Sequence, residues 1–357
     1  MSVLNVLHCV SSLNIGGAEK CAVNLAQHQA SVGYKAAVMS FGSEDEPFCK
    51  ELRNANIDVF IVNGNILQRA LKLFRIIKDF DYIHIHSPAV IRAFTFVFPA
   101  LYSKWVIYTM HGEHQATLFG MKSAHYLANG YLNQKFAVSN RVKAGVEQRY
   151  GWQSEDVTVI ANGIPVSRQK KEQHSKHEKM QFGMVARLVE LKQIDQVVLQ
   201  MRAENLQTKA HLNIYGEGPL ETQLQALVDQ YQLSEHVTLH GREMDPDKIY
   251  NSIDCLIINS TTEGLPMVML EAMSYGVPLV STKVGAIPEL IDKGRFGLLI
   301  DIGDTHGLAT AMESVIDDPE HYAQMSNRAF DFVEEHYALS KVSEQYLAAY
   351  LKGNAHE

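Results

Sequence analysis

Residues 254–282 read DCLIINSTTEGLPMVMLEAMSYGVPLVST and predict a strand, a helix and a second strand in close succession. The apolar run Asp254–Asn259 has the length and composition of a buried strand. Met267–Tyr275 predicts a short helix that ends at Gly276, a residue type that commonly terminates helices. Pro278–Ser281 then predicts the next strand. A strand, a crossover helix and a second strand form the repeating unit of a parallel α/β sheet.

The same alternation continues on both sides of this unit. The further strand candidates are Val3–Val10, Lys35–Phe41, Ile57–Val62, Tyr82–His86, Trp105–Met110, Lys135–Val138, Met180–Val185, His211–Tyr215, His236–His240 and Gly297–Ile300. A polar, charged segment at 166–180 interrupts the alternation and predicts an interdomain linker. We therefore expect an α/β protein with two tandem Rossmann-like domains, 1–165 and 166–339, each a doubly wound parallel sheet. An amphipathic C-terminal helix within 340–357 is expected to cap the second domain or to pack back on the first.

The composition is that of a globular protein, with 46% hydrophobic and 20% charged residues among 357. The longest apolar stretch, Ala93–Tyr102, is too short to span a bilayer, and the N-terminus lacks the features of a signal peptide. The four cysteines form no CxxC pair, which argues against a zinc knuckle and a disulfide framework. We therefore expect a cytoplasmic protein.

Charge is distributed unevenly between the two halves of the chain. Residues 1–165 contain 15 Lys and Arg against 12 Asp and Glu, a balance of +3. Residues 166–357 contain 17 against 28, a balance of −11. The acidic second half argues against nucleic acid as a partner. The mildly basic first half is compatible with an anionic membrane face or an anionic acceptor.

One segment of the basic half, Leu67–Phe80, is amphipathic and carries Arg69, Lys72, Arg75 and Lys78. An ordinary surface helix is the favoured interpretation of this pattern. The alternative is an interfacial helix that brings the protein into peripheral contact with anionic lipid at the inner face of the membrane.

The helix that opens near Pro266 carries one charged side chain in an apolar setting. Glu271 is the only charged residue between Gly264 and Thr282, and such a carboxylate is costly to bury without partners. One explanation is a structural salt bridge or hydrogen bond; the other is a bidentate hydrogen bond to the vicinal hydroxyls of a ribose. Composition does not separate these two. The start of the helix lies at the carboxyl end of a strand, where free backbone N–H groups attract phosphate.

Several motifs resemble those of the family 4 retaining glycosyltransferases, whose GT-B fold has two Rossmann-like domains facing a cleft. EGLPMVMLEAMSYGVPLVST resembles the E-x7-E signature of that family, and VGAIPELI at 284–291 continues it. The other matching segments are IGGAEK (15–20), HIHSP (84–88), TMHGEH (109–114), ANGI (161–164), ARLVELKQID (186–195) and YGEGPL (215–220). The E-x7-E block is a specific signal, whereas the two-glycine loops alone are weak. The resemblance covers most of the chain and implies a nucleotide-sugar-dependent enzyme.

The resemblance implies catalytic roles for Arg187, Lys192, Glu263 and His111. Arg187 and Lys192 would clamp the diphosphate and stabilise charge on the departing β-phosphate; the alternative is a pair of solvated surface cations. Glu263 would lie near hydroxyls of the transferred sugar and support positive charge at its anomeric carbon. His111 would position the sugar rather than act as a general base. No Asp-x-Asp pair suits a divalent ion, so we expect no metal and no other cofactor.

The donor is expected to contact several loops. The expected nucleotide- and sugar-binding residues are Gly16, Gly17, Gly216, Gly218, Arg242, Gly264, Leu265, Pro266, Met267 and Glu271. The backbone of 264–267 would hold the sugar and the phosphate, and the base would pack near the 216–218 loop and His240–Glu243. Gly16 and Gly17 form either a simple tight turn or a point where the donor phosphate or the acceptor approaches the backbone closely. The absence of G-x-G-x-x-G weighs against a dehydrogenase.

Histidines offer a competing interpretation of the first domain. His84 and His86 lie on one face of a predicted strand, and with His111 and His114 they suggest the alternative of a metal site. No second pair of residues at a ligand spacing supports that site, so we favour local hydrogen bonding.

These inferences lead to one principal hypothesis and two alternatives. The principal one is a retaining glycosyltransferase that moves a hexose from a nucleoside diphosphate, expected to be uridine, to a saccharide or lipid-linked acceptor in surface polysaccharide biosynthesis. We find no second carboxylate at a family-matched position in the first domain, which fits front-side displacement with the leaving phosphate accepting the acceptor's proton. The alternatives are a nucleotide-sugar 2-epimerase of the same fold and a non-catalytic nucleotide-sugar-binding protein.

Overall fold

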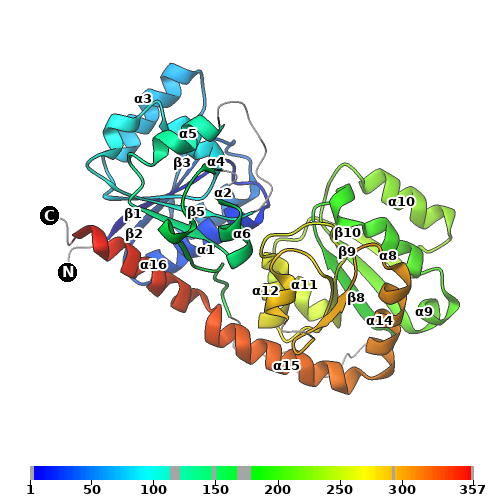
Figure 1. Cartoon of the computed structure of the whole chain (residues 1–357). Helices are drawn as coiled ribbons and strands as arrows, with labels where there is room; N and C mark the ends of the chain where they lie inside the picture. The colour runs from blue at the N-terminus through cyan, green and yellow to red at the C-terminus, as the bar shows by residue number, and fades with distance from the viewer. Residues whose placement is uncertain (1–3, 113–120, 147–149, 167–177, 292–293, 355–357) are drawn as a thin grey trace. The chain divides into compact units, whose positions relative to one another are not determined.

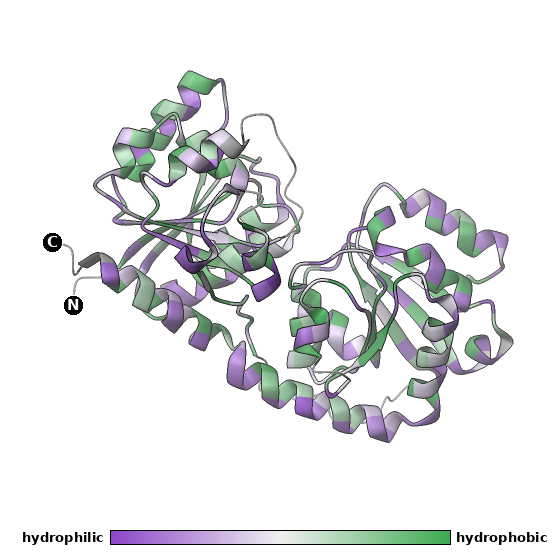
Figure 2. Ribbon diagram, viewed as in Figure 1, coloured by the Kyte–Doolittle hydropathy of each residue, from purple (hydrophilic) through white to green (hydrophobic). Residues whose placement is uncertain are grey.

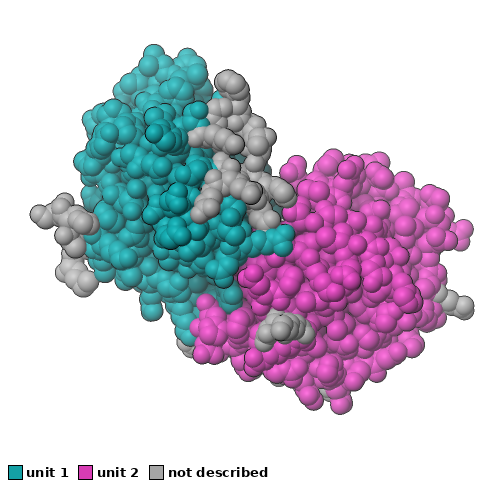
Figure 3. Space-filling view, viewed as in Figure 1, with its two compact units in different colours: residues 1–164, 337–357 teal, residues 165–336 magenta. Residues whose placement is uncertain are grey.

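The computed structural model describes residues 4–112, 121–146, 150–166, 178–291 and 294–354. The chain divides into two compact units (Figure 3): unit 1 comprises 1–164 and 337–357, and unit 2 comprises 165–336. Most of the expected linker at 166–180, namely 167–177, lies outside the described residues. The predicted fold class is confirmed, because each unit contains one parallel sheet with helices packed around it (Figure 1).

Unit 1 contains a seven-stranded parallel sheet in the order β3-β2-β1-β4-β5-β6-β7. Its strands are β1 Asn5–Val10, β2 Lys35–Ser40, β3 Asp58–Ile61, β4 Tyr82–Ile85, β5 Trp105–Met110, β6 Gln134–Ala137 and β7 Val157–Val159. Sequence reasoning identified six of these and missed β7. Three residues are too few to show the periodicity of a strand, and β7 exists because it adds to the edge of a sheet that is already formed.

Unit 2 contains a six-stranded parallel sheet in the order β10-β9-β8-β11-β12-β13. Its strands are β8 Met180–Val185, β9 Ala210–Tyr215, β10 Val237–Gly241, β11 Cys255–Ile258, β12 Leu279–Thr282 and β13 Leu298–Ile300. Each matches a predicted strand within two residues. The central strands are nearly continuous runs of apolar side chains because helices cover both faces of the sheet.

Helices follow most strands. In unit 1 they are α1 Gly17–Ser31, α2 Pro47–Asn54, α3 Ile66–Ile77, α4 Pro88–Phe94, η1 Phe98–Leu101, α5 Met121–Ala128, α6 Asn140–Ala144, η2 Ser154–Asp156 and α16 Leu339–Asn354. In unit 2 they are η3 Glu190–Lys192, α8 Ile194–Gln200, α9 Glu204–Lys209, α10 Glu221–Gln230, α11 Pro246–Ser252, α12 Met267–Ser274, α13 Ile287–Leu290, α14 Thr305–Asp317 and α15 Pro319–His336. Side-chain caps open several of them, including Asn65 of α3, Ser87 of α4 and Asp304 of α14.

The C-terminal helix α16 belongs to unit 1, beside α1 (Figure 1). Its apolar face, which includes Val342, Tyr346 and Tyr350, is buried in one cluster with strand and α1 side chains of that unit. Backbone hydrogen bonds also join Ile164 to the start of α16: Ile164 N donates to Tyr337 O, and Leu339 N donates to Ile164 O. Periodicity left two partners open for this helix, and the packing places it on the first.

Both sheets reverse their strand order at one point, which lies between β1 and β4 in unit 1 and between β8 and β11 in unit 2. At such a point the loops that leave two neighbouring strands run in opposite directions, so ligands bind between them. The residues of interest from sequence follow these strands. This topology therefore decides which of them meet.

One detail differs from the prediction at the E-x7-E segment. The helix α12 begins at Met267, as predicted, but ends at Ser274, with Tyr275 as its C-terminal cap. This is a shift of one residue at a helix end. Among the residues that the structure describes, no helix combines the length and the apolar character needed to cross a bilayer.

Candidate active site

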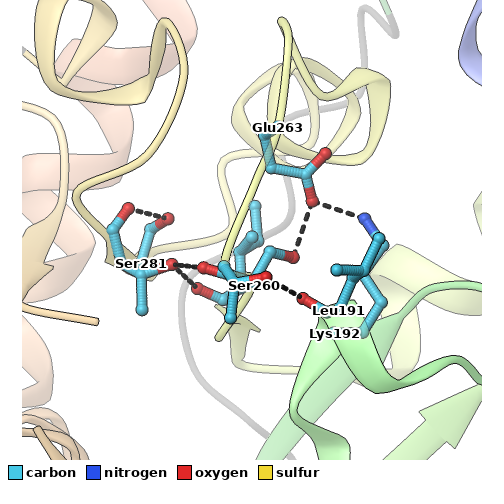
Figure 4. A network of polar contacts seen from close by, with 8 residues as sticks. Leu191, Lys192, Ser260, Glu263 and Ser281 are labelled. Carbon is cyan, nitrogen blue, oxygen red and sulfur yellow. Dashed lines mark hydrogen bonds and ion pairs between the residues drawn. The ribbon is translucent and has the colours of Figure 1, made fainter. Parts of the chain in front are cut away.

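The centre of the candidate site is an ion pair at the reversal point of unit 2. Lys192, at the end of the loop after β8, directs its Nζ to Glu263 Oε1 at 2.5 Å, and Glu263 lies in the loop after β11. Ser260 Oγ donates to the same carboxylate oxygen at 2.7 Å, as Figure 4 shows. The Glu263 side chain is 12% exposed and the Lys192 side chain 24% exposed. Because the Lys192 side chain is the more exposed member of the pair, an anionic ligand can approach its charge from solvent.

Backbone hydrogen bonds hold the two loops of this pair in register. Thr261 N donates to Leu191 O at 2.8 Å, which ties the loop after β11 to the loop after β8. Thr282 Oγ1, at the end of β12, donates to Ser260 O at 2.7 Å. The position of Glu263 is therefore set by three neighbouring strands rather than by its own loop alone.

Glycine is required beside the Glu263 loop. Gly285 has φ +56°, and a Cβ built there would lie 2.2 Å from Glu263 O and 2.6 Å from Gly264 O. Ala286 N donates to Gly264 O at 2.9 Å. The segment after β12 thus packs directly on the backbone of Gly264, where only a residue without a side chain fits.

The backbone expected to hold phosphate lies at the start of α12. Leu265, Pro266 and Met267 are buried, so their side chains anchor the loop in unit 2 and leave backbone groups for a ligand. Pro266 has no polar side chain to cap the helix, and its φ and ψ of −70° and 123° are extended. An uncapped helix start of this kind provides N–H groups that an anion can accept.

Glu271 lies one helical turn further along α12. Tyr250 of α11 donates its hydroxyl to Glu271 Oε2 at 2.8 Å, and that hydroxyl also lies 3.3 Å from Val268 O. Burial, reinforced by the nearby Glu271 carboxylate, raises the pKa of Tyr250, so the phenol stays protonated and serves as a donor. Tyr250 thus supplies one hydrogen-bond partner for this half-buried carboxylate, as the structural explanation for Glu271 requires.

Arg187 is exposed on the loop after β8, and that loop is joined to the glycine loop after β9. Leu188 N donates to Glu217 O at 3.0 Å, and a Cβ at Gly218 would lie 2.4 Å from Leu188 O. Gly216 has φ +139°, and a Cβ there would lie 1.9 Å from Ala186 O. Gly216 and Gly218 thus permit two loops to pack backbone to backbone, which positions the Arg187 loop.

Arg242 pairs with Glu217 at 2.5 Å, and both side chains are exposed. His240 stacks on Tyr215, with ring centroids 4.4 Å apart and an interplanar angle of 8°. The 216–218 loop and the His240–Glu243 segment are therefore adjacent, as the sequence hypothesis for a base-binding region requires.

In unit 1, Gly16 caps α1 and Gly17 begins it. Glu19 turns back over Gly16, since a Cβ at Gly16 would lie 2.3 Å from Glu19 Oε2. Burial raises the pKa of Glu19 against the opposing effect of its backbone hydrogen bond. Glu46 accepts from Leu13 N in the same loop at 2.5 Å. Carboxylates beside Gly16 disfavour a phosphate there and favour a ligand that presents hydroxyl groups.

His111 follows β5 and contacts His86, whose Nδ1 lies 3.1 Å from His111 Nε2. Burial lowers the pKa of His111 to about 4, against an opposing effect of Asn162. An imidazole that is neutral at neutral pH is compatible with the predicted role in sugar positioning. It carries no extra proton and so is not suited to act as a general acid. His114, which entered the alternative of a metal site, lies outside the described residues.

Two groups of side chains have the proximity of metal ligands in the described parts of the chain. One is His8, His84 and His86, and the other is Cys21, His86 and His111. Burial raises the pKa of Cys21 to about 12, which is typical of a thiol enclosed in a core. Hydrogen bonds account for the first group, as described below.

The structure brings Lys192, Glu263 and the 264–267 backbone together, and it joins Arg187 to the Gly216 and Gly218 loop. It places Gly16, Gly17 and His111 in the other unit. Sequence reasoning missed Tyr250, Ser260, Gly285, Glu19 and Gln29. Gly285 lies inside the motif VGAIPELI and could have been found from it, whereas no local pattern connects Tyr250 with Glu271.

Comparison with known proteins agrees with this geometry. The model described as "Glycosyltransferase Family 4" matches residues 15–168, and the model "Glycosyl transferases group 1" matches residues 166–332. Between them the two models cover the chain from 15 to 332. The first model covers β2 to β7 of unit 1, and the second covers all six strands of unit 2.

Individual relatives are distant. N-acetyl-alpha-D-glucosaminyl L-malate synthase of Bacillus anthracis is 31% identical over 160 residues, or 45% of this chain and 42% of the relative. Lipopolysaccharide core biosynthesis glycosyltransferase LpsE of Rhizobium meliloti is 26% identical over 137 residues, 38% of this chain and 40% of the relative. The matches thus span about two fifths of the length of these curated relatives.

Among solved structures, Anabaena Alr3699/HepE in complex with UDP and glucose superposes with a TM-score of 0.83. The identity is 20%, and the alignment covers 98% of this chain and 100% of that one. This similarity shows the fold. Together with the two family models, it establishes that the chain belongs to the family 4-like glycosyltransferases of the GT-B type.

Proposed function

We propose that the chain is a retaining hexosyltransferase that uses a nucleoside-diphosphate sugar, with UDP as the nucleotide, and a saccharide or lipid-linked acceptor. The observation that carries the proposal is the Lys192–Glu263 pair at the reversal point of unit 2, beside the uncapped start of α12. This arrangement offers a cation and backbone N–H groups to a diphosphate, and a carboxylate to sugar hydroxyls. HepE, which has the same fold, was solved with UDP and glucose.

In the proposed reaction the bond between the anomeric carbon and the β-phosphate oxygen breaks, and a bond from the anomeric carbon to the acceptor oxygen forms on the same face. The acceptor's hydroxyl proton moves to the departing phosphate, so the products are UDP and the glycosylated acceptor. Lys192 and Arg187 stabilise the charge that develops on the β-phosphate, and these fixed cations fit a reaction without a metal. Glu263 holds Lys192 and faces the transferred sugar.

The proposed donor site assigns Glu271 to the ribose and the 216–218 and 240–243 segments to the base. The proposed acceptor region includes the loop of Gly16 and Gly17, where Glu19 and Glu46 favour hydroxyl groups. A role in surface polysaccharide biosynthesis is supported by relatives such as LpsE, whose name refers to lipopolysaccharide core biosynthesis.

A donor panel tests the proposal. UDP-glucose, UDP-galactose, UDP-N-acetylglucosamine and GDP-mannose are each added while thermal unfolding is measured. A true donor at 100 times its dissociation constant should stabilise the folded protein by about 2.7 kcal/mol. Transfer to free and lipid-anchored monosaccharides is then followed by UDP release, and NMR of the product should show the anomeric configuration of the donor.

Three outcomes would overturn parts of the proposal. Absence of any thermal shift with all donors would contradict nucleotide-sugar binding. Conversion of a UDP-sugar to its 2-epimer without acceptor would favour the epimerase alternative. Binding without turnover on any acceptor, unchanged in a Lys192→Ala variant, would favour a non-catalytic binding protein.

We further propose that α3 contacts an anionic membrane surface, which is where a lipid-linked acceptor would lie. Its large apolar side chains Ile66, Leu67, Leu71 and Phe74 are 67%, 70%, 53% and 42% exposed. Basic residues alternate with these apolar ones along the helix, and Figure 2 shows α3 with alternating hydrophilic and hydrophobic colours. An exposed apolar row with flanking cations is the pattern of an interfacial helix, whereas an ordinary surface helix exposes its polar face.

Vesicle co-sedimentation tests this contact. Binding to phosphatidylglycerol vesicles is expected to exceed binding to phosphatidylcholine vesicles and to fall as salt is raised. Leu71→Glu is expected to weaken it, whereas Leu191→Glu, a change at a leucine of unit 2 with nearly the same exposure (52% against 53%), should not. Equal binding to both lipids, or no binding to either, would contradict the proposal.

A further inference from the structure

Four histidines gather on one face of the unit 1 sheet. His8 of β1 lies beside His84 of β4 in the strand register, His86 follows β4, and His111 follows β5. His8, His84 and His86 are buried, with the exposed fraction of each at or below 1%. So many imidazoles in one core require hydrogen-bond partners, because burial of an unpaired polar group is costly.

Three of the rings form a chain that starts on α1. Gln29 is buried, and its Oε1 lies 2.9 Å from His8 Nε2. His8 Nδ1 lies 3.0 Å from His86 Nε2. His86 Nδ1 lies 3.1 Å from His111 Nε2. The chain therefore connects a buried glutamine of α1 with the histidine that follows β5.

The first link decides where every proton in this chain resides. An amide oxygen only accepts, so His8 Nε2 carries a hydrogen and donates it to Gln29. Burial lowers the pKa of His8 to about 4 and that of His86 well below its ordinary value, so each ring is neutral and has one N–H. His8 Nδ1 is then an acceptor, and His86 must donate to it from Nε2. By the same rule His86 Nδ1 accepts from His111 Nε2.

The chain ends on an unprotonated nitrogen. With its hydrogen on Nε2, neutral His111 has a lone pair at Nδ1. That nitrogen is buried, and no described residue meets hydrogen-bond geometry with it. Asn162 interacts with the same ring, so the competing tautomer is one in which His111 Nδ1–H donates to the Asn162 amide oxygen. An acceptor left in this state costs free energy, and a hydroxyl donor would satisfy it.

We propose that Gln29, His8 and His86 are positioning residues that hold His111 in its Nε2–H tautomer and present His111 Nδ1 as an acceptor for a hydroxyl of the sugar substrate. The identity of the hydroxyl rests on the proposed function, whereas the tautomer does not. The opposite tautomer would present an N–H at this place and would favour a carbonyl or phosphate oxygen over a hydroxyl proton. Gln29 thereby sets the polarity of a binding residue through two intervening rings.

His84 belongs to a separate branch. Its Nδ1 lies 2.8 Å from the hydroxyl of Tyr350 on α16, and its Nε2 lies 2.8 Å from Thr109 Oγ1. Thr109 Oγ1 in turn lies 3.1 Å from the hydroxyl of Tyr346. Gln29 Nε2 also donates to the Tyr350 hydroxyl at 3.5 Å, so Tyr350 touches both branches. Tyr346 lies at the other end of the His84 branch, and its hydroxyl provides a control within the same core.

A metal ion is the competing explanation for the cluster. The ligand atoms of His8, His84 and His86 lie within 4.8 Å of one another. Every ring nitrogen of these three residues already has a hydrogen-bond partner. Metal binding would break those bonds and bury a double positive charge without a carboxylate. Hydrogen bonding is therefore the better account.

Nitrogen-15 NMR of histidine-labelled protein without ligand tests the tautomer directly. The wild-type His111 ring, assigned by loss of its signals in His111→Asn, should show a protonated Nε2 and an unprotonated Nδ1. Gln29→Leu removes the acceptor and should give a mixture of tautomers or the Nδ1–H form. Gln29→Asn keeps an amide oxygen on a shorter side chain and should retain more of the Nε2–H form than Gln29→Leu does. Tyr346→Phe, which removes a hydroxyl of the His84 branch, should leave His111 unchanged.

Kinetics then test the role of the lone pair. Gln29→Leu is expected to raise the KM for the donor or acceptor sugar about 3- to 10-fold, the effect of one neutral hydrogen bond, with a smaller change in kcat. Tyr346→Phe should leave both parameters near wild type. Melting temperatures of all variants show which of them are folded, and Gln29→Asn keeps the test valid if Gln29→Leu does not fold.

Each result has one meaning. A protonated Nδ1 at wild-type His111 overturns the relay, as does one equivalent of tightly bound metal in the purified protein. An unchanged tautomer in Gln29→Leu overturns the part assigned to Gln29. If the tautomers behave as expected but no nucleotide sugar binds, the proposed function fails while the relay stands on its own spectra.

Discussion

The reversal points of the two sheets have the same topology and opposite chemistry. Between β8 and β11, unit 2 holds an ion pair, Lys192 with Glu263, close to the surface. Between β1 and β4, unit 1 holds the neutral rings of His8 and His84 in its core. One half of the fold thus presents charge, and the other presents directed hydrogen bonds. The fold provides the place, and the residues in that place decide which ligand chemistry each unit can serve.

The largest expected difference between the two units is the loss of stability in acid. Burial lowers the pKa of His8 and of His111 to about 4. Unfolded rings take up protons as the pH falls through about 6.5, so the unfolded state binds more protons than the folded state between these values. The contribution of these neutral rings to the free energy of unfolding is therefore fully present above about pH 6.5. It falls as the pH is lowered towards 4, by about 1.4 kcal/mol per pH unit for each ring.

Both tryptophans of the chain, Trp105 and Trp152, lie in unit 1, so their fluorescence during denaturation reports that unit. Hydrogen exchange of peptides from β8 to β12 reports unit 2. Burial also lowers the pKa of His211 and His240 in unit 2, where the rings are only partly buried, so a weaker slope is expected there. His321→Ala, a change at an exposed histidine, should not alter either slope. Equal slopes for both units would contradict the contrast.

Removal of the cation from unit 2 should have the next largest effect. Lys192→Ala is expected to lower kcat/KM about 10²- to 10³-fold, the cost of losing a fixed group that stabilises transition-state charge. Lys209→Ala is the control, since Lys209 pairs with Asp317 at 3.4 Å on an exposed surface of the same unit. Steady-state kinetics with the donor identified by thermal shift provide the measurement. A loss below about 5-fold would mean that Lys192 is a structural cation rather than a catalytic one.

The backbone support of the charged site can be tested separately. Gly285→Ala and Gly303→Ala both force alanine to a positive φ, at +56° and +76°, but only Gly285 faces backbone oxygens. Gly303 has no atom within 4 Å of an added Cβ. Chemical denaturation should show Gly285→Ala to be less stable than Gly303→Ala by about 1–3 kcal/mol, the cost of overpacking. Equal losses would show that strain in φ explains both and that the 285 contact is not tight.

The smallest effect should come from the tyrosine beside Glu271. Tyr250→Phe deletes the hydroxyl that donates to Glu271 Oε2 at 2.8 Å and should weaken donor binding about 3- to 10-fold, as expected for one hydrogen bond. Tyr322→Phe deletes a comparable hydrogen bond, to Ser314 Oγ at 3.0 Å, and should leave donor affinity unchanged. Isothermal titration with the nucleoside diphosphate compares the two. Equal affinities would remove Tyr250 from the donor site.

Local pattern located most of the strands because each one is a short, nearly continuous apolar run between polar loops. The family resemblance predicted site roles for Lys192 and Glu263, which are 71 positions apart in the chain. Their proximity follows from strand order, since β8 and β11 are neighbours in the sheet and not in the chain. The partner of Glu271 could not be identified in this way, because Tyr250 belongs to a different helix and no spacing rule connects them.

The sequence by itself determined the alternation of strands and helices, the family motifs, and the residue types that can bind a nucleotide sugar. Those features are local, since each depends on side chains within a few positions of one another. Only the tertiary structure decided that α16 completes the core of unit 1, that Gly285 supports the Glu263 loop, and that Gln29 reaches His111 through His8 and His86. These contacts join residues that are distant in the chain, and the crossover connections of the two parallel sheets bring them together.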